Sequence, residues 1–357
     1  MKYLQRYELG ELPGNAPRAV RVRLSMLAFI ALAALILGVI SFGDRSTLLD
    51  QADYVTYFRE ASWSWFVALW DHSANLFVFA VKMTTEEIGW RLWVVTLASM
   101  GFSPEAGVRI TAIALNLLMI FALSKTRWPF FSLLLWAVLP YGLAILGLFQ
   151  IRQGFALAIA MYFALNRRQP VRGALIASIV HTTYSIPALF LVLTHFVGKA
   201  KAMKGVSVVT MAAVGMSLVS AVLFTLYGGR RLKAYDQVEA YTLFSLIGLV
   251  IYLLVPAMVL WTRKFRTALD DAARDEVTRQ LATMHIGLLV FLIVSYFVYP
   301  FAISRIGYYG TLMIPFLLPE VRLKSRAVFY LSTIVIMVMV YAVVKNYLDG
   351  NYSYFIG

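Results

Sequence analysis

The chain has 357 residues, of which 61% are hydrophobic and 14% charged, a composition that points to a membrane protein and excludes an ordinary soluble domain. Its formal charge of +14 lies mostly in short segments between apolar runs, where lysine and arginine set membrane orientation, so it does not indicate a nucleic-acid partner. The absence of cysteine excludes disulfides, thiolate catalysis and cysteine-bound metals. The histidines lack the close helical spacing of a zinc site. They are His72, His181, His195 and His285.

The amino-terminal part predicts one span followed by one outer-face region. Residues 1–24 are rich in lysine and arginine and are therefore expected to form a cytoplasmic tail. The apolar run that follows, about residues 25–42, is longer than a signal-peptide core and is interpreted as an uncleaved span. It delivers the acidic and aromatic residues 43–101 to the outer face. We expect an interfacial helix at 63–81 and a short outer or re-entrant helix at 88–101.

The remaining apolar runs alternate with basic loops and predict ten further crossings. Basic clusters at 166–172 and 199–204 mark cytoplasmic loops, so residues 171–198 are expected to go out and return as two short helices. A dozen helical residues rise only about 18 Å, which places their turn, near His181, within the outer half of the membrane. Pro187 is expected to supply this break. The other predicted crossings are 106–123, 128–149, 152–165, 205–227, 242–261, 285–303, 306–319 and 327–345.

These elements describe an all-α, polytopic membrane protein with about eleven transmembrane or half-membrane helices. Residues 25–345 would form one transmembrane domain, and residues 346–357 would form a tail on the outer side. The charge-rich segment 263–280 is expected to be a solvated amphipathic helix in the cytoplasm, because opposite charges alternate along it at helical spacing. His195 and His285 fall near predicted cytoplasmic ends and are interpreted as bystanders.

Two arginines, Arg152 and Arg305, occupy apolar sequence in which a charge is costly. At the centre of a spanning helix the cost is about 3 kcal/mol even on the lenient insertion scale. Both arginines lie among polar residues and glycines on the predicted outer side, and the planar guanidinium fork matches a diphosphate. We therefore expect an anion site that faces away from the cytoplasm. The alternative is structural pairing with Glu87, Asp53 or helix-end carbonyls.

Chemistry at such a site would also need a group that takes or orients a hydroxyl proton, and the candidates are His181, Glu87 and Asp53. His181 lies at the predicted helix break among hydroxyl side chains, but a histidine that merely caps a turn explains it almost as well. Each carboxylate alone is typical of an ordinary solvated group in outer-face sequence. No Asp-x-Asp pair lies on the outer side to hold a metal with a nucleotide sugar, so neither a metal nor a cofactor is expected.

Four short elements on the predicted outer face together resemble a known family. They are Asp53-Tyr-Val-Thr-Tyr57, Glu87-Ile-Gly-Trp90, Arg152-Gln-Gly-Phe-Ala156 with His181-Thr downstream, and Arg305-Ile-Gly-Tyr-Tyr309. The chain resembles the EpsG-type exopolysaccharide polymerases, which are related in function to the Wzy O-antigen polymerases. The arginine-glutamine-glycine element with its downstream histidine is the most specific part, and the resemblance covers most of the chain from about residue 25.

By this resemblance the protein would be a membrane glycosyltransferase with a GT-C-like fold, acting at the outer, periplasmic face of the bacterial inner membrane. The donor would be a glycan on undecaprenyl diphosphate and the acceptor a repeat unit on a second carrier. The expected partners are thus an undecaprenyl-diphosphate-linked oligosaccharide, membrane lipid and a chain-length regulator. The catalytic residues that the resemblance implies are Arg152, His181, Glu87 and Arg305. The substrate-binding residues that it implies are Asp53, Tyr57, Gln153, Trp90, Tyr308 and Tyr309.

Three other functions fit parts of the same pattern. A flippase or transporter of lipid-linked oligosaccharide would also place arginines in a wet cavity. It should show repeat symmetry and charged residues in both membrane halves, whereas this sequence concentrates its polar groups toward one face. A ligase that transfers a finished chain would use similar arginine and histidine chemistry, and only the order of the motifs argues against it. A structural or lipid-binding membrane protein leaves the two arginines unexplained.

Overall fold

The structure, a computed structural model, is built of helices in every part of the chain that it describes, as the composition predicts. The described residues are 18–43, 48, 50–71, 75–76, 79, 86–197, 202–227, 243–262, 269–298, 310–323 and 325–348.

Among the described residues, five helices are long and apolar enough to cross a membrane. They are α2 (Arg18–Phe42), α7 (Pro104–Leu123), α12 (Ala202–Tyr227), α16 (Leu269–Val298) and α19 (Arg326–Leu348). A sixth span results if α8 (Pro129–Val138) and η2 (Pro140–Phe149), which are bent by 68°, count together. The shorter apolar helices are α9 (Ile151–Leu165), α10 (Pro170–Val180), α11 (Ser185–Val197), α14 (Leu243–Tyr252) and α15 (Leu254–Thr262). The structure therefore supports five or six full spans, and the count of eleven stays a prediction.

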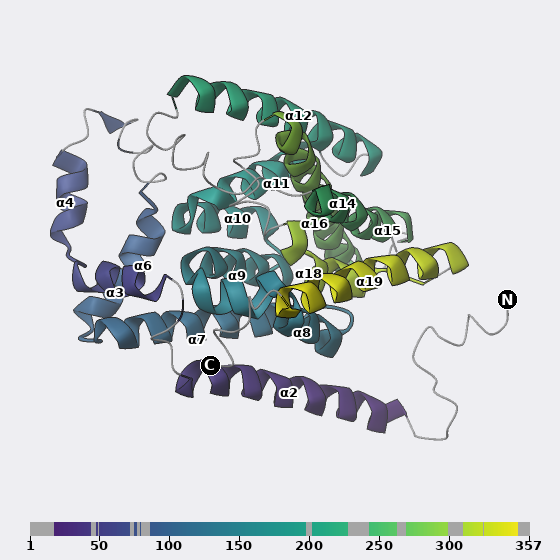
Figure 1. The fold of residues 1–357 in the computed structure, drawn as a ribbon, viewed down its shortest axis with the longest axis horizontal. Coiled ribbons are helices and arrows are strands. Elements are labelled where there is room, and N and C mark those ends of the chain that lie inside the picture. Colours follow the sequence, from purple (N-terminus) through teal and green to yellow (C-terminus); the bar gives the residue numbers. More distant parts are fainter. Residues whose placement is uncertain are drawn as a thin grey trace.

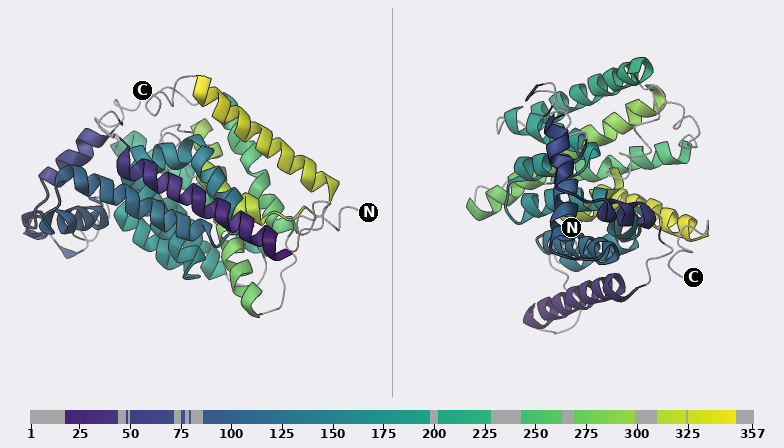
Figure 2. Two further views of the ribbon diagram at one scale, coloured as in Figure 1. Left: turned by 90° about the horizontal axis from the view of Figure 1, so that it is seen from below. Right: turned by 90° about the vertical axis from the view of Figure 1, so that its left-hand side faces the viewer.

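The helices form a bundle with α9 in its interior, packed between α7 and α10 (Figure 1). Helix α12 packs along α16, while α2 packs against α7 and α8, so that α2 and α12 lie on opposite sides of the bundle (Figures 1 and 2). Large apolar side chains of α2, such as Leu27, Leu35 and Phe42, are exposed, as expected for a helix that faces lipid.

Three short helices gather at one end of the bundle, at the left of Figure 1. They are α3 (Gln51–Arg59), α4 (Ser64–Asp71) and α6 (Ile88–Ser99), and they come from the region predicted to face outward. The expected interfacial helix at 63–81 is described as α4 over its first part only, with Val67 and Trp70 exposed, and much of its remainder lies outside the described residues. Helix α6 packs on α3, α7 and α10, which brings the outer-face region onto the bundle.

The break between α10 and α11 occurs where the sequence predicts it, but its cause is different. Helix α10 ends at Val180, His181 is extended (φ −147°, ψ 122°), and a single 3-10 turn, η3 (Thr182–Tyr184), leads into α11. Pro187 lies in the first turn of α11, where the missing N–H of a proline removes no helical hydrogen bond. The assignment of the break to Pro187 is therefore wrong, because the chain bends earlier, at His181.

The amino-terminal half of α16 contradicts a second prediction. Segment 263–280 was expected to be a separate solvated helix, yet from Leu269 onward it continues without a break into the span. Asp275, Arg279 and Gln280 are almost fully buried, with exposed fractions of 5%, 6% and 6%. Arg279 and Gln280 can be buried because Glu276 bonds Arg279 through both carboxylate oxygens (2.6 and 2.9 Å) and also accepts from Gln280 (2.7 Å). Alternating charges here pair with one another and with neighbouring helices instead of with water.

Two further contacts join α16 to neighbouring segments. The buried Glu320 accepts hydrogen bonds from the Arg274 guanidinium (2.8 Å) and from the backbone N–H of Arg127 (2.9 Å). Farther along α16, His285 is fully buried and its Nε2 lies 2.6 Å from the carbonyl oxygen of Gly310. His285 is therefore well inside the helix and not near a cytoplasmic end, because the buried charged turns extend α16 beyond the predicted span.

A buried amide holds the bent pair α8–η2 in place. Asn116 of α7 donates to the carbonyl oxygens of Ala112 (2.9 Å) and Gly147 (3.1 Å) and accepts from the Trp136 indole (3.3 Å). Asn116 and Trp136 have no exposed surface, so these bonds form in a low-dielectric core, where an unmet polar group would be costly. The amide therefore fixes η2 against α7, and η2 in turn sets where α9 begins.

Candidate active site

Arg152 lies in the first turn of α9, directly after the chain breaks at Gln150. Its Nη1 is 2.8 Å from Oε2 of Glu87 and 3.5 Å from the hydroxyl of Tyr57, which belongs to α3. Its Nε is buried and makes no hydrogen bond with the described part of the chain. The side chain is 24% exposed, so this arginine is neither deeply enclosed nor fully solvated. It keeps a counter-charge and still has a donor available for a ligand.

Glu87 is the carboxylate at the centre of the cluster. It precedes α6 with φ 54° and ψ 54°, a left-handed conformation that a glutamate keeps only where surrounding contacts fix it. Its Oε1 accepts from the backbone N–H (3.2 Å) and the hydroxyl (3.3 Å) of Thr182, and lies 3.7 Å from Nε2 of His181. Only about 10% of the Glu87 side chain is exposed, so it is not the ordinary solvated carboxylate of the alternative interpretation.

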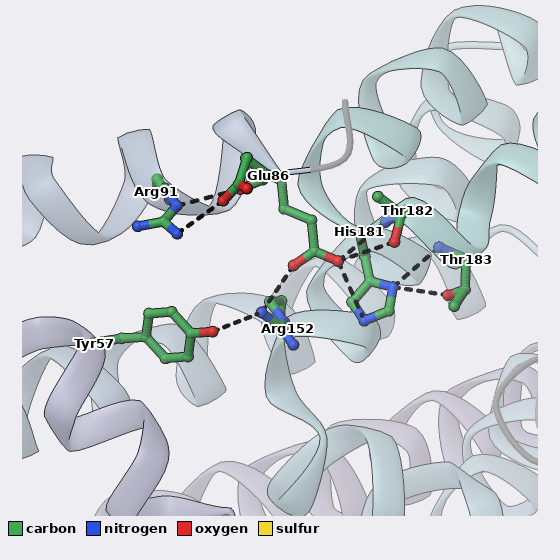
Figure 3. A network of polar contacts seen from close by, with 8 residues as sticks. Tyr57, Glu86, Arg91, Arg152, His181, Thr182 and Thr183 are labelled. Atoms are coloured by element: carbon green, nitrogen blue, oxygen red, sulfur yellow. Dashed lines mark hydrogen bonds and ion pairs between the residues drawn. The ribbon is translucent and has the colours of Figure 1, made fainter. Parts of the chain in front are cut away.

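His181 faces Glu87 from the link between α10 and η3. Its Nδ1 lies 2.7 Å from the hydroxyl of Thr183 and accepts from the backbone N–H of the same residue (3.3 Å). Figure 3 shows Tyr57, Arg152 and His181 converging from separate elements, with dashed lines tracing the polar contacts among them. The structure thus brings together four of the residues expected at the site, from parts of the chain that are far apart in sequence.

The other expected site residues are placed differently. Gln153 is buried beside Arg152 on α9, and Asp53 is on the exposed side of α3. Trp90 has no exposed surface and packs edge-on against Tyr54 and Phe58, at ring-centroid distances of 5.8 and 6.5 Å. This position does not support the stacking of Trp90 on a sugar, because its ring faces are already covered by the core.

The second predicted arginine element cannot be placed. Arg305, Tyr308 and Tyr309 lie outside the described residues, so their expected roles stay predictions. Tyr54 lies in the same short motif as Tyr57, and its aromatic ring could stack on a sugar or simply lie at the membrane interface. Burial raises the pKa of Tyr54 above its ordinary value, although the nearby Arg152 guanidinium lowers it in part. The Tyr54 phenol therefore remains protonated at neutral pH.

The sequence model of the EpsG family matches residues 26–355, which is nearly the whole chain. The chain belongs to the EpsG family. No curated protein and no solved structure matches it. Membership in the EpsG family, together with the apolar helices, indicates a multi-pass membrane protein with an exopolysaccharide-polymerase role, as the four motifs predict.

Two of the glycines in the four motifs, Gly89 and Gly154, have a packing role that the sequence alone did not reveal. A Cβ on Gly89 would lie 2.9 Å from the Val180 side chain and 3.0 Å from the Ile179 carbonyl oxygen, so α6 approaches α10 closely just before His181. A Cβ on Gly154 would overlap the carbonyl oxygen of Leu146, so α9 and η2 are in direct backbone contact beside Arg152. Both close approaches set the positions of charged residues in the cluster.

We expect Gly154→Ala to lower both the stability and the activity of this EpsG protein. The added methyl group collides with backbone, which cannot rotate away, and overpacking of this kind costs about 1–3 kcal/mol. Thermal unfolding in detergent should show a lower midpoint. Gly215→Ala in α12 is the matched control, because a Cβ there meets nothing within 4 Å and should leave the midpoint unchanged or slightly raised. A midpoint for Gly154→Ala equal to that of the wild type would contradict this packing.

The sequence also did not predict the contacts of the two threonines at the turn, Thr182 and Thr183. The hydroxyl-rich run after His181 is visible in the sequence, but only the folded turn shows that Thr182 bonds Glu87 while Thr183 bonds His181. Two consecutive threonines therefore bond two different groups, the carboxylate of Glu87 and the imidazole of His181. The sequence could have predicted these two partners only if the end of α10 at His181 had been known.

Proposed function

We propose that this protein polymerises lipid-linked glycan by transferring a growing chain from undecaprenyl diphosphate to a lipid-linked repeat unit at the outer face of the membrane. The observation that carries the proposal is the cluster of Glu87, Arg152 and His181, partly buried and assembled from the motif residues of the EpsG family. Intramembrane ionisable groups of this kind are functional candidates by default. The localisation proposed is the bacterial inner membrane, with the cluster facing the periplasm.

The transfer requires charge to be handled at the departing group. The acceptor hydroxyl oxygen forms the new bond to the anomeric carbon of the donor glycan. The bond from that carbon to the diphosphate oxygen breaks, and its electron pair leaves with the lipid diphosphate. A positioned cation stabilises this negative charge, and Arg152 is suited to the role because its Nε has no hydrogen bond within the described chain. The hydroxyl proton passes to a base, for which Glu87 and His181 are the candidates in the cluster.

The Arg152–Glu87 ion pair explains how a charged arginine is accommodated in this partly buried site when no ligand is bound. Without substrate, the 2.8 Å ion pair compensates both charges. A bound diphosphate would compete for the same guanidinium, and the bond to Glu87 would weaken as Arg152 turned to the new anion. Membrane lipid and a chain-length regulator remain proposed partners.

A flippase or transporter of lipid-linked oligosaccharide remains the second candidate, because one observation favours it. The buried charges of Asp275, Arg279 and Glu320 lie at the predicted cytoplasmic end of α16, far along the chain from the outer-face cluster. Charged groups in both membrane halves are what a transport pathway would show. The polymerase is preferred because the pairs formed by Arg279 and Glu320 account structurally for their burial.

Deletion of the gene in its host, followed by electrophoresis of the surface polysaccharide, tests the proposal. Loss of the ladder, with single repeat units still reaching the surface acceptor, is the expected result for a polymerase. Polymer stranded on its lipid carrier would indicate a ligase. Lipid-linked units trapped inside the cell would indicate a flippase. Membranes from the complemented strain should extend added lipid-linked units in the presence of a chelator, because arginine is proposed to replace a divalent ion.

A further inference from the structure

The ring of His181 is approached on one nitrogen by two donors from a single residue. The backbone N–H of Thr183 points at Nδ1 across 3.3 Å, and the Thr183 hydroxyl lies 2.7 Å from the same atom. A backbone amide nitrogen can only donate, so Nδ1 must present a lone pair and carry no proton. The hydroxyl is therefore also a donor in this contact, since Nδ1 is the acceptor.

The proton of the neutral ring must then be on Nε2. This nitrogen lies 3.7 Å from Oε1 of Glu87, an electrostatic contact that is longer than a hydrogen bond. The tautomer of a histidine is set by the hydrogen bond that its other nitrogen makes, and here Thr183 makes that bond. The short turn enforces the arrangement, because the backbone N–H of Tyr184 bonds the His181 carbonyl oxygen at 3.0 Å.

We propose that Thr183 is a positioning residue that fixes His181 with its proton on Nε2, so that His181 acts as a donor toward Glu87 and not as the base. In this role His181 orients and stabilises the carboxylate. Both ring nitrogens are then unable to take a proton from an acceptor hydroxyl, because Nδ1 is bonded to Thr183 and Nε2 already carries hydrogen. Of the two base candidates in the cluster, Glu87 is the one left. The functional part of this inference rests on the proposed function.

Nitrogen-15 NMR of the ring-labelled protein in detergent tests the tautomer directly. At about pH 8, an ordinary imidazole is neutral, and a protonated ring nitrogen is distinguished from an unprotonated one by its chemical shift. The sequence contains four histidines, and the signal of His181 is assigned by its loss in His181→Gln. We expect the wild type to show an unprotonated Nδ1 and a protonated Nε2.

Two substitutions at Thr183 distinguish the effect of losing the hydroxyl from the effect of changing the shape of the turn. Thr183→Ser keeps the hydroxyl and should keep the tautomer. Thr183→Val removes the 2.7 Å hydroxyl contact and leaves only the longer, weaker backbone contact of 3.3 Å on Nδ1. The preference for the Nε2 proton should therefore weaken to a mixture of tautomers, with chain extension reduced by about tenfold, the effect of one hydrogen bond. Thr194→Val is the matched control, because that buried hydroxyl bonds the Phe190 carbonyl oxygen within α11 at 2.7 Å and its loss should leave the His181 signals unchanged.

The outcomes distinguish this inference from the proposed function. A wild-type His181 with its proton on Nδ1 would overturn the inference whatever the activity of the protein. So would a Thr183→Val variant that keeps the wild-type tautomer, since the hydroxyl would then not be the fixing group. A polymerase assay in which substitution of Arg152 has no effect would instead count against the proposed function, while the tautomer measurement, which needs no substrate, would still stand.

Discussion

Arg152→Lys should reduce chain extension by about 10²- to 10³-fold while the protein still inserts and folds, an effect comparable to the loss of one preorganised transition-state donor. Lysine retains the positive charge and can still pair with Glu87, which is 2.8 Å from the guanidinium in the wild type. It lacks the planar fork and has no counterpart of the buried Nε. The measurements are extension of lipid-linked units by isolated membranes and the surface ladder of the complemented strain.

The choice of lysine follows from the ion pair. Arg152→Ala would leave Glu87 as a buried, uncompensated charge, which costs about 3–5 kcal/mol, so that a loss of activity could reflect misfolding. Arg172→Lys is the control, because Arg172 is exposed at the start of α10, where it contacts the side chains of Gln169 and Phe163. Near-normal extension by Arg152→Lys would show that a point charge suffices and that a planar clamp on the diphosphate is wrong.

Glu87→Gln should reduce chain extension by about 10²- to 10⁴-fold, the range associated with a general acid or base. Glutamine keeps the shape of the side chain and can still accept from Thr182, but it cannot hold the transferred proton. It also leaves Arg152 without its counter-charge, so we expect a lower thermal midpoint as well. The assay is again extension by membranes, normalised to the amount of folded protein.

The neighbouring carboxylate provides the control for this substitution. Glu86 is 48% exposed and pairs with Arg91 at 3.2 Å, so Glu86→Gln should change stability by less than about 1 kcal/mol and leave extension near the wild-type level. The double variant Glu87→Gln with Arg152→Gln removes both charges together. It should recover stability relative to Glu87→Gln without recovering activity. Retained extension in Glu87→Gln would remove Glu87 from consideration as the base.

The sequence predicted the class of fold well because the membrane imposes a simple rule on apolar runs. Runs of spanning length became α2, α7, α12 and α19 near their expected positions. The rule failed for α16, because it treats every charge as solvated, whereas the charges of Asp275 and Arg279 are buried in a helix with internal pairing. The rule about apolar runs also does not predict local bends. The chain breaks at His181 because of the backbone conformation there and not because of Pro187.

The site was predicted in its members but not in its contacts. Arg152 was conspicuous because it is costly in apolar sequence, and the motifs supplied Glu87 and His181. The sequence could not show that Arg152 both pairs with Glu87 and keeps an unbonded donor, because that depends on how three segments meet. The left-handed backbone of Glu87 was equally hidden, since glutamate has no preference for it. Trp90 was expected to bind substrate, but it has no exposed surface, and an aromatic residue in a motif can be present for packing alone.

The order of the cluster along the chain bears on how this protein is made. Glu87 and Tyr57 leave the ribosome before Arg152, and proteins fold largely from the amino terminus during synthesis. In the proposed topology, the carboxylate that neutralises Arg152 is exported with the segment before α9, and this happens before the translocon releases α9. Arg152 can therefore pair with Glu87 as soon as α9 enters the membrane. This pairing lowers the free-energy cost of inserting a short helix that carries a charge in its first turn. Biogenesis and chemistry thus depend on the same pair of side chains.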